Sequence, residues 1–289
     1  MRALEPTRTG TVERDGVRVH WEEFGAGEPA IALLPTWSIA HSRLWKFQIP
    51  HLARHYRVIT FDGRGCGRSD RPTDPAAYSF LEFAADTRAV LDATDTERVV
   101  LVGLSMGAVW GIQVAVDEPA RVAGVVCLGP AIAMVPMAPE RVEYAFDERL
   151  DTTEGWAKYN RYHWLEGGYP DFLDFFFDRF FPEPHSTKQI EDFIGWGLEI
   201  PPETLVATDE GFVPPGHPRF RTVCERVSVP VLVIHGDEDE MSLHGNGRAL
   251  AELVGGQLLT IAGGGHGVLA RDPVIVNRAI KHFVDRVVR

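Results

Sequence analysis

Cysteines, basic runs and long apolar stretches are all scarce in this sequence, and each absence excludes a class of protein. The 289 residues include three cysteines, Cys66, Cys127 and Cys224. Their odd number and wide spacing predict neither a disulfide framework nor a zinc site. No H-E-x-x-H pair or similar motif occurs, so no metal is predicted. The longest uncharged stretch, residues 122–139, is broken by prolines and does not predict a membrane helix.

Positive charge is also in short supply. Lysine and arginine number 29 against 41 aspartates and glutamates, which gives a net charge of −12. Without any basic run, this balance argues against nucleic acid and against anionic membrane surfaces as partners. Residues 1–10 are polar and contain no apolar segment of the kind found in signal peptides. We therefore expect a cytoplasmic protein.

The residues that are present alternate between two patterns. Short apolar runs bounded by glycine or proline predict buried strands, and longer amphipathic stretches predict helices. Strands are expected at residues 11–14, 17–24, 30–34, 57–61, 98–102, 122–128, 229–235 and 258–261, and helices at 78–93, 108–117 and 273–288. Asp15-Gly16 predicts a tight hairpin between the first two strands. The alternation indicates a mainly parallel sheet with helices on both faces.

One long stretch departs from this alternation. Between residues 131 and 227 the strand-like runs vanish and aromatic residues cluster, which predicts a mostly helical insertion. The expected organisation is therefore a core made of residues 1–130 and 228–289, with residues 131–227 as a cap. Within the cap, the run Phe175 to Phe181 fits either the lining of an apolar substrate pocket or the buried face of a helix.

The motif Gly103-Leu104-Ser105-Met106-Gly107 is the strongest chemical signal. It lies between a predicted strand and a predicted helix. A serine at such a strand-to-helix turn sits on a sharp corner with its hydroxyl exposed above the sheet, and small residues are needed where the two arms of the corner meet. This context favours a nucleophile over a buried serine that caps a core helix.

A nucleophilic serine needs a base, and the base needs an acid that fixes its tautomer. His266 follows three glycines after the strand that ends at Ile261, and the glycines free the backbone for a close approach. The strand 229–235 runs into a loop that contains Asp237 and Asp239. Since reactive groups gather at the carboxyl ends of parallel strands, serine, acid and histidine are expected to meet there.

Together these motifs resemble those of the α/β-hydrolase fold superfamily along nearly the whole chain. Further matches are the turn F-D-G-R-G-C-G-R-S-D from Phe61 to Asp70, the loop H-G-D-E-D from His235 to Asp239, and the G-G-G-H stretch with its following R-D-P. The resemblance is to capped, cofactor-free esterases and haloperoxidase-like hydrolases, and it implies an eight-stranded sheet and no cofactor. The family pattern G-x-x-D places the acid at Asp239, which leaves Asp237 as a turn residue.

Two stretches need a separate interpretation. Members of the family usually carry His-Gly after the strand that ends here at Leu34, but this chain has Pro35-Thr36. By position, the backbone N–H groups of Trp37 and Met106 would form the oxyanion hole, and distortion of that hole would cost about a hundredfold in rate. The turn from Phe61 to Asp70 matches no phosphate-binding motif, so we interpret it as structural, held by Arg64 and Asp70.

The sequence thus predicts a serine hydrolase that acts on a small ester or lactone. Ser105 would be the nucleophile, His266 the base and Asp239 the orienting acid. The aromatic cap favours an apolar or aromatic substrate. Two alternatives remain: the same triad could cleave a carbon–carbon bond or carry out a cofactor-free perhydrolase or haloperoxidase reaction, or the chain could be a weakly catalytic ligand receptor.

Overall fold

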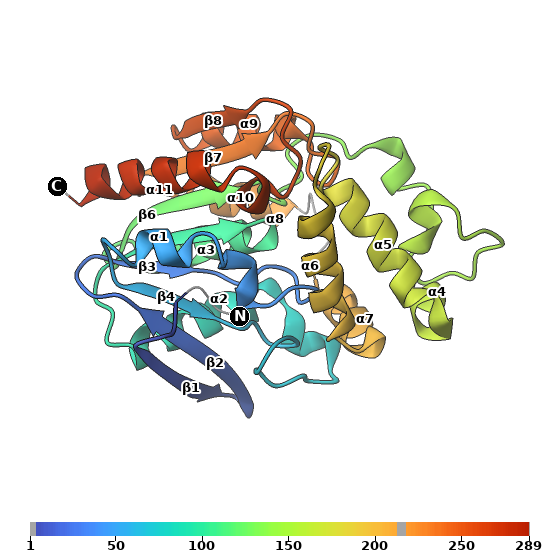
Figure 1. Cartoon of the computed structure of the whole chain (residues 1–289), viewed down its shortest axis with the longest axis horizontal. Coiled ribbons are helices and arrows are strands. Elements are labelled where there is room, and N and C mark those ends of the chain that lie inside the picture. Colours follow the sequence, from blue (N-terminus) through green and yellow to red (C-terminus); the bar gives the residue numbers. More distant parts are fainter. Residues whose placement is uncertain (1–3, 213–217, 289) are drawn as a thin grey trace.

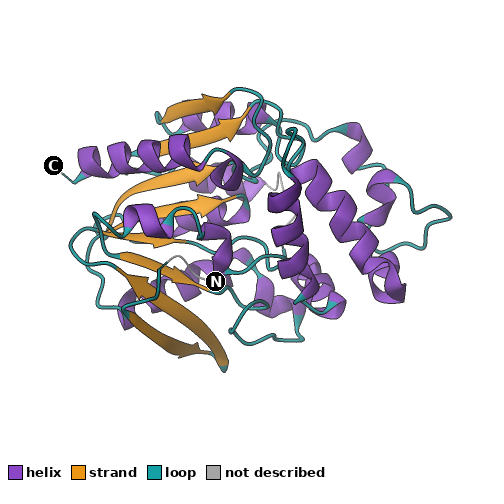
Figure 2. Cartoon of the chain, viewed as in Figure 1, coloured by secondary structure: helices purple, strands orange, loops and turns teal. Residues whose placement is uncertain are grey.

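The computed structural model describes residues 4–212 and 218–288. Its centre is an eight-stranded sheet in the order β1-β2-β4-β3-β5-β6-β7-β8 (Figures 1 and 2). β1 pairs antiparallel with β2, β2 pairs antiparallel with β4, and all the other pairs are parallel. The strands are β1 (Arg8–Arg14), β2 (Val17–Phe24), β3 (Ala30–Leu33), β4 (Val58–Phe61), β5 (Val99–Leu104), β6 (Val122–Leu128), β7 (Val231–Gly236) and β8 (Gln257–Ile261).

Helices cover both faces of this sheet. The α-helices are α1 (Ile49–Leu52), α2 (Phe80–Ala93), α3 (Met106–Asp117), α4 (Arg161–His163), α5 (Tyr169–Phe180), α6 (Thr187–Leu198), α7 (Pro202–Gly211), α8 (Pro218–Cys224), α9 (His244–Leu253), α10 (Val268–Arg271) and α11 (Pro273–Val287). Shorter helical turns are η1 (Ser42–Trp45), η2 (Pro75–Tyr78), η3 (Pro139–Arg141), η4 (Gly155–Lys158) and η5 (Trp164–Gly168). In Figure 1, α1 and α11 lie on the near face, and α2, α3 and α9 on the far face.

The sheet forms where the sequence predicts it. β3, β4, β5 and β7 are buried along their whole length, as expected for parallel strands covered on both faces. The first hairpin turns at Asp15 and Gly16, whose φ angles of 52° and 78° are both positive, as a two-residue hairpin turn requires. These observations confirm the predicted fold class, an α/β-hydrolase sheet that is mainly parallel.

Element boundaries differ from the predictions where local chemistry intervenes. The predicted helix 78–93 begins at Phe80, because η2 ends at Tyr78 and the chain extends again at Ser79. The predicted strand 229–235 begins at Val231, just after Pro230, which has no N–H to donate to a neighbouring strand. α9 was not predicted, because glycines interrupt its helical pattern.

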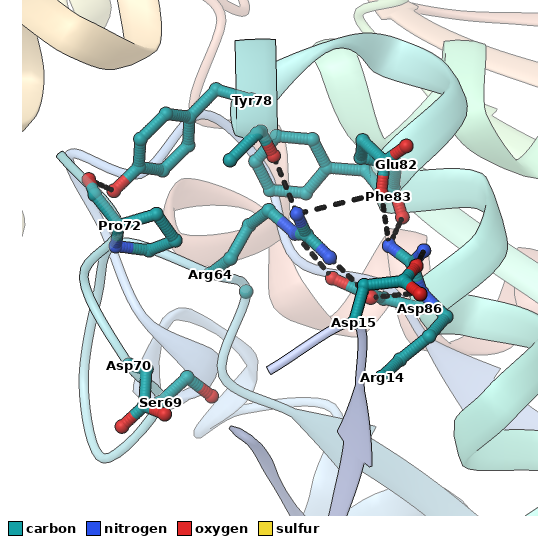
Figure 3. A network of polar contacts seen from close by, with 12 residues as sticks. Arg14, Asp15, Arg64, Ser69, Asp70, Pro72, Tyr78, Glu82, Phe83 and Asp86 are labelled. Atoms are coloured by element: carbon teal, nitrogen blue, oxygen red, sulfur yellow. Dashed lines mark hydrogen bonds and ion pairs between the residues drawn. The ribbon is translucent and has the colours of Figure 1, made fainter. Parts of the chain in front are cut away.

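The turn from Phe61 to Asp70 is structural, and Arg64 and Asp70 both hold it, as expected, each through a partner outside the turn. The Arg64 guanidinium is buried and lies 2.7 and 2.8 Å from the carboxylate of Asp86 in α2 (Figure 3). Asp70 binds Arg18 of β2, at 3.0 Å. The buried carboxylate attracts Arg64 because burial makes an unpaired charge costly, and Arg14 reaches the same carboxylate at 2.9 Å.

Residues 131–212 and 218–227 form what we call the helical segment. Across these described residues, between β6 and β7, every regular element is helical. Its helices α4 to α7 lie beyond the carboxyl ends of the parallel strands, on the right of Figure 1, whereas α8 packs against α3 behind the sheet. The position of α4 to α7 places them over the edge of the sheet where the candidate residues are found. In the described part of the chain, none of the helices combines the length and the apolar character needed to cross a bilayer.

Candidate active site

Ser105 occupies a strained corner between β5 and α3. Its φ of 55° and ψ of −117° lie where residues other than glycine are rarely found. A Cβ on Gly103 would lie 2.3 Å from the carbonyl carbon of Gly107, and a Cβ on Gly107 would lie 2.3 Å from the carbonyl oxygen of Pro35. Both positions therefore require glycine, for the steric reason that the sequence motif suggested.

The structure brings His266 and Asp239 into direct contact. His266 Nδ1 lies 2.7 Å from Asp239 Oδ2, and both side chains are buried. Asp239 Oδ1 accepts from the N–H groups of Met241 and Ser242, at 2.8 and 2.9 Å. Burial alone would raise the pKa of Asp239, but the charges and hydrogen bonds of His266 and His235 outweigh it and hold that pKa well below its usual range.

Asp237 plays a different part in the same loop. Its side chain is exposed, and its Oδ1 accepts a hydrogen bond of 2.6 Å from the N–H of Gly263. This bond joins the loop after β7 to the loop after β8, so Asp237 helps to hold His266 and Asp239 together from outside. The expected turn bond to its own local backbone is thus replaced by a bond between two loops.

His235 is a part of this site that sequence reasoning missed. Its Nε2 lies 3.0 Å from Asp239 Oδ2 and 2.7 Å from the carbonyl oxygen of Ser242. Because both neighbours are acceptors, Nε2 carries the hydrogen. The ring is fully buried, and its Nδ1 has no hydrogen-bond partner among the described residues. The available signal was a histidine at the end of a buried strand, four residues before the candidate acid.

The loop that carries His266 is bound to the end of α5. The carbonyl oxygen of Phe180 accepts from the N–H groups of His266 and Gly267, at 3.1 and 3.2 Å. Gly265 N–H donates to Glu183 Oε1 at 2.6 Å. The edge of the Phe180 ring packs against the imidazole, with 4.6 Å between the ring centroids. The helical segment therefore helps to position the candidate base.

Glycines permit this close approach. A Cβ on Gly265 would lie 2.3 Å from Pro182 Cδ, and a Cβ on Gly267 would lie 1.9 Å from the ring of Phe181. Neither contact is sterically possible, so only glycine fits at these two positions. The three glycines before His266 were expected to allow such a close approach, and for Gly265 the segment approached is the chain at Pro182.

Ser105 and His266 both line a cavity of about 330 Å³ between the sheet edge and the helical segment. Much of its wall is aromatic, and the aromatic lining residues are Trp37, Trp156, Tyr159, Phe176, Phe177, Phe180, Phe193 and Phe212. Phe176, Phe177 and Phe180 are also the buried face of α5. The run Phe175 to Phe181 therefore supplies both the buried face of a helix and part of the cavity lining, so the two interpretations are compatible.

The candidate oxyanion-hole residues reach the same cavity. Trp37 and Met106 both line it, as does Thr36. Within the described ranges, no backbone or side-chain acceptor takes the N–H of Trp37 or of Met106. The Trp37 ring is held by a 2.8 Å hydrogen bond from its Nε1 to Thr208 Oγ1 in α7. Replacement of the usual His-Gly by Pro35-Thr36 thus leaves two N–H donors beside the cavity.

Several polar residues of the cavity wall come from places that the sequence analysis did not single out. The Tyr159 hydroxyl donates to Asp209 of α7, and burial raises the pKa of Asp209 to about 6. Arg141, Glu240 and Asn246 also line the cavity. Across residues 4–212 and 218–288, no group of three or more His, Cys, Asp or Glu side chains is placed to hold a metal ion.

Comparison with known proteins identifies relatives along the whole length. The family model for the alpha/beta hydrolase fold matches residues 29–273. A Synechocystis protein provisionally named a non-heme chloroperoxidase is 28% identical over 282 residues, 93% of this chain and 95% of that protein. A provisionally named carbamate hydrolase from Variovorax paradoxus is 39% identical over 109 residues, and the match spans 37% of this chain and only 41% of that relative.

Solved structures agree with this assignment. Est816, described as an N-acyl homoserine lactone degrading enzyme, superposes with a TM-score of 0.76 at 25% identity. The superposition covers 95% of this chain and all of that one, 100%. The shared architecture therefore extends over nearly the whole of both chains.

Proposed function

Because the chain belongs to the alpha/beta hydrolase fold family, we propose that it is a serine hydrolase that cleaves a carboxylic ester or a lactone through an acyl-enzyme. The observation that carries this proposal is the buried pair of His266 and Asp239, 2.7 Å apart, in a cavity that the strained Ser105 also lines. A nucleophile, a base and an orienting acid at the ends of separate strands are the parts that acyl transfer requires.

In the proposed mechanism, Asp239 accepts the Nδ1 hydrogen of His266, which leaves the Nε2 lone pair to act as base. His266 takes the proton of Ser105 as the hydroxyl oxygen attacks the substrate carbonyl. The N–H groups of Trp37 and Met106 hold the developing oxyanion. His266 then gives its proton to the leaving alcohol, and the same residues activate water to hydrolyse the acyl-enzyme.

The electrostatics of Asp239 suit this role. Its donors keep its pKa far below neutrality, so the carboxylate stays charged and stabilises the imidazolium that forms during the reaction. The same donors fix the direction in which the carboxylate points. The imidazole therefore begins each cycle in one tautomer and one orientation.

We further propose that the helical segment is a cap domain that selects the substrate. Its aromatic residues form much of the cavity wall and favour an apolar or aromatic substrate body. The described activity of Est816 on a lactone supports the inclusion of lactones beside open-chain esters. A panel of esters, lactones and amides, assayed with the purified protein, would rank these substrate classes.

A fluorophosphonate probe and one substitution test the nucleophile. We expect rapid labelling at Ser105, and Ser105→Ala should lower kcat for ester hydrolysis by about a millionfold while it preserves substrate binding. Ser79→Ala is the matched control, because that serine lies outside the cavity and makes no capping hydrogen bond. Folded protein that resists the probe would support a weakly catalytic ligand receptor instead.

A second reaction at the same residues is favoured by the relative provisionally named a chloroperoxidase. In perhydrolysis, hydrogen peroxide replaces water in the attack on the acyl-enzyme, which releases a peracid and regenerates the serine. Peracid formation from a short carboxylic acid and peroxide would reveal this activity. Cleavage of a diketone would point to the remaining alternative, carbon–carbon bond hydrolysis.

The compartment is also a proposal. We propose that the protein works in the cytoplasm, where thiols stay reduced. Cys66, Cys127 and Cys224 are free and buried, and burial raises the pKa of each thiol and keeps it unreactive. Cell fractionation with an antibody against the chain would test this location.

A further inference from the structure

Arg141 brings a positive charge into the cavity that Ser105 and His266 line. It is the last residue of η3, in the helical segment, and it is only partly exposed. Its Nη1 donates to the carbonyl oxygen of Met241, and its guanidinium carbon lies 4.5 Å from the centre of the Trp156 ring. These two contacts hold the guanidinium in the cavity wall.

Within the described ranges, the ion pairs within 4.0 Å do not include Arg141, and the Asp239 carboxylate acts on it only from a longer distance. The carboxylates of the same wall have other partners: Asp209 accepts from Tyr159, and Glu240 lies 3.2 Å from Arg179. Burial lowers the pKa of Arg141, but an arginine remains charged at neutral pH. Because proteins normally pair their buried charges, a guanidinium in a cavity wall without a carboxylate in direct contact indicates an anionic ligand.

The chemistry of the group narrows the choice of ligand. Guanidinium presents five N–H donors in a planar fork, and this fork matches the two oxygens of a carboxylate. We infer that Arg141 binds a carboxylate of the substrate, so that the substrate is an ester or lactone that carries a free carboxylate away from the bond that is cleaved. This inference rests on the proposed hydrolase function and adds a second recognition element to its aromatic cavity.

Met241 contacts both Arg141 and Asp239 and so links the proposed carboxylate-binding group to the proposed orienting acid. Its N–H donates to Asp239 Oδ1 at 2.8 Å, and its carbonyl oxygen accepts from Arg141. One residue thus anchors both the carboxylate that orients His266 and the cation that would bind the substrate. A carboxylate held by Arg141 therefore sets the substrate carbonyl at a defined reach from Ser105, with the carbon body against the aromatic wall.

Equilibrium binding tests Arg141 without relying on turnover. In Ser105→Ala protein, we expect phenylbutyrate to bind at least about tenfold more tightly than phenylbutyramide, its neutral isostere. Adding Arg141→Gln should abolish this preference, whereas Arg141→Lys should retain part of it. Arg149→Gln is the matched control, because that arginine lies in the same segment with its side chain 67% exposed and paired with Glu166. Equal binding of acid and amide, or a preference that survives Arg141→Gln, overturns the inference.

Kinetics separate this inference from the proposed function. The intact protein should hydrolyse mono-para-nitrophenyl glutarate with a kcat/KM about ten to a hundred times that for para-nitrophenyl pentanoate, and the ratio should fall toward one in Arg141→Gln. Hydrolysis of both esters with equal efficiency would overturn the role of Arg141 and leave the hydrolase standing. Undiminished hydrolysis in Ser105→Ala would instead overturn the proposed nucleophile, while acid-over-amide binding would still report on Arg141.

Discussion

The loop after β7 and helix α7 each place a carboxylate beside the same cavity, one buried and one partly buried, yet the two groups behave in opposite ways. Asp239, on the sheet side, has a pKa held well below its usual range. Asp209, in the helical segment, has a pKa raised to about 6. Burial raises the pKa of both groups, yet Asp239, the more buried one, has the lowered pKa, so burial alone does not decide the direction. Asp239 receives two backbone N–H bonds and two histidine contacts, whereas the hydrogen bond described for Asp209 comes from one Tyr159 hydroxyl.

This difference fits the roles that we propose for the two regions, catalysis for the sheet edge and substrate selection for the helical segment. The sheet edge surrounds its carboxylate with donors from a rigid frame, so the charge is permanent and its direction is fixed. The helical segment gives Asp209 one hydroxyl donor and the like charge of Glu210, which do not offset the effect of burial, so the charge of Asp209 depends on pH near neutrality. A carboxylate whose charge is permanent, such as Asp239, suits a catalytic step that is the same in every cycle. A carboxylate whose charge can change, such as Asp209, suits the selection of a substrate.

The largest expected effect comes from substitution of Asp239, the carboxylate on the sheet side. Asp239→Asn should lower kcat by about ten-thousandfold, because an amide can hold His266 in the wrong tautomer. Asp237→Asn is the matched variant in the same loop, and its effect should be far smaller because Asp237 binds only the backbone of Gly263. Initial rates on one activated ester would rank the two variants. A reversed ranking would reassign the orienting acid to Asp237.

A smaller effect measures how much the second histidine contributes. His235→Leu removes a donor from Asp239 Oδ2 and should lower kcat by about tenfold, since His266, Met241 and Ser242 still bind the carboxylate. His244→Gln is the control, because that ring lies next to His235 but binds Thr260. If His235→Leu lowers only the melting temperature and leaves kcat per folded molecule intact, His235 serves packing alone.

The third expected effect is on stability rather than on rate, and it concerns the helical side. The folded pKa of Asp209, about 6, lies above the unfolded value of about 3.9, so its protonated form favours the fold. Its contribution is fully present below about pH 4 and is lost as the pH rises through about 6. Asp209→Asn should therefore be more stable than the wild type at pH 7, by on the order of 2 kcal/mol, with the difference vanishing near pH 4.

Asp239 supplies the contrasting slope. Its folded pKa lies below the unfolded value, so it stabilises the fold above about pH 4 and loses that contribution as the pH falls further. Denaturant unfolding of both Asn variants between about pH 2 and pH 7 would compare the two regions directly, because the Asp239 contribution changes below about pH 4 and that of Asp209 above it. Parallel pH profiles for the two variants would contradict the contrast drawn here.

The fold was largely predictable from the sequence because its signals are local. The hairpin at Asp15-Gly16, the apolar runs of the parallel strands and the glycines around Ser105 each follow from the conformations of a few neighbouring residues. The strand predicted at 122–128 is β6 with the same bounds. Residues at the ends of parallel strands converge by topology, which is why His266 and Asp239 were expected to meet.

Side-chain partners were harder to predict because they depend on packing between distant elements. Arg64 was expected to hold its turn, but its partner, the buried Asp86 carboxylate on α2, lies outside the turn and left no local signal. His235 reaches Asp239 only because the loop after β7 folds back over the end of its own strand. Arg141 offered no signal at all, because its place in the cavity depends on how an irregular stretch of the helical segment settles on Met241.

The carbonyl group of Phe180 has a consequence for how molecules pass in and out. It binds the loop of His266 to the end of α5. A movement of α5 away from the sheet would therefore carry the imidazole away from Ser105 each time the cavity opened. We therefore expect substrate and product to pass on another side of the cavity, at Met137, which lines the cavity and is 37% exposed to solvent. In this arrangement the surface around Met137 opens, while the end of α5 and the loop of His266 keep their positions.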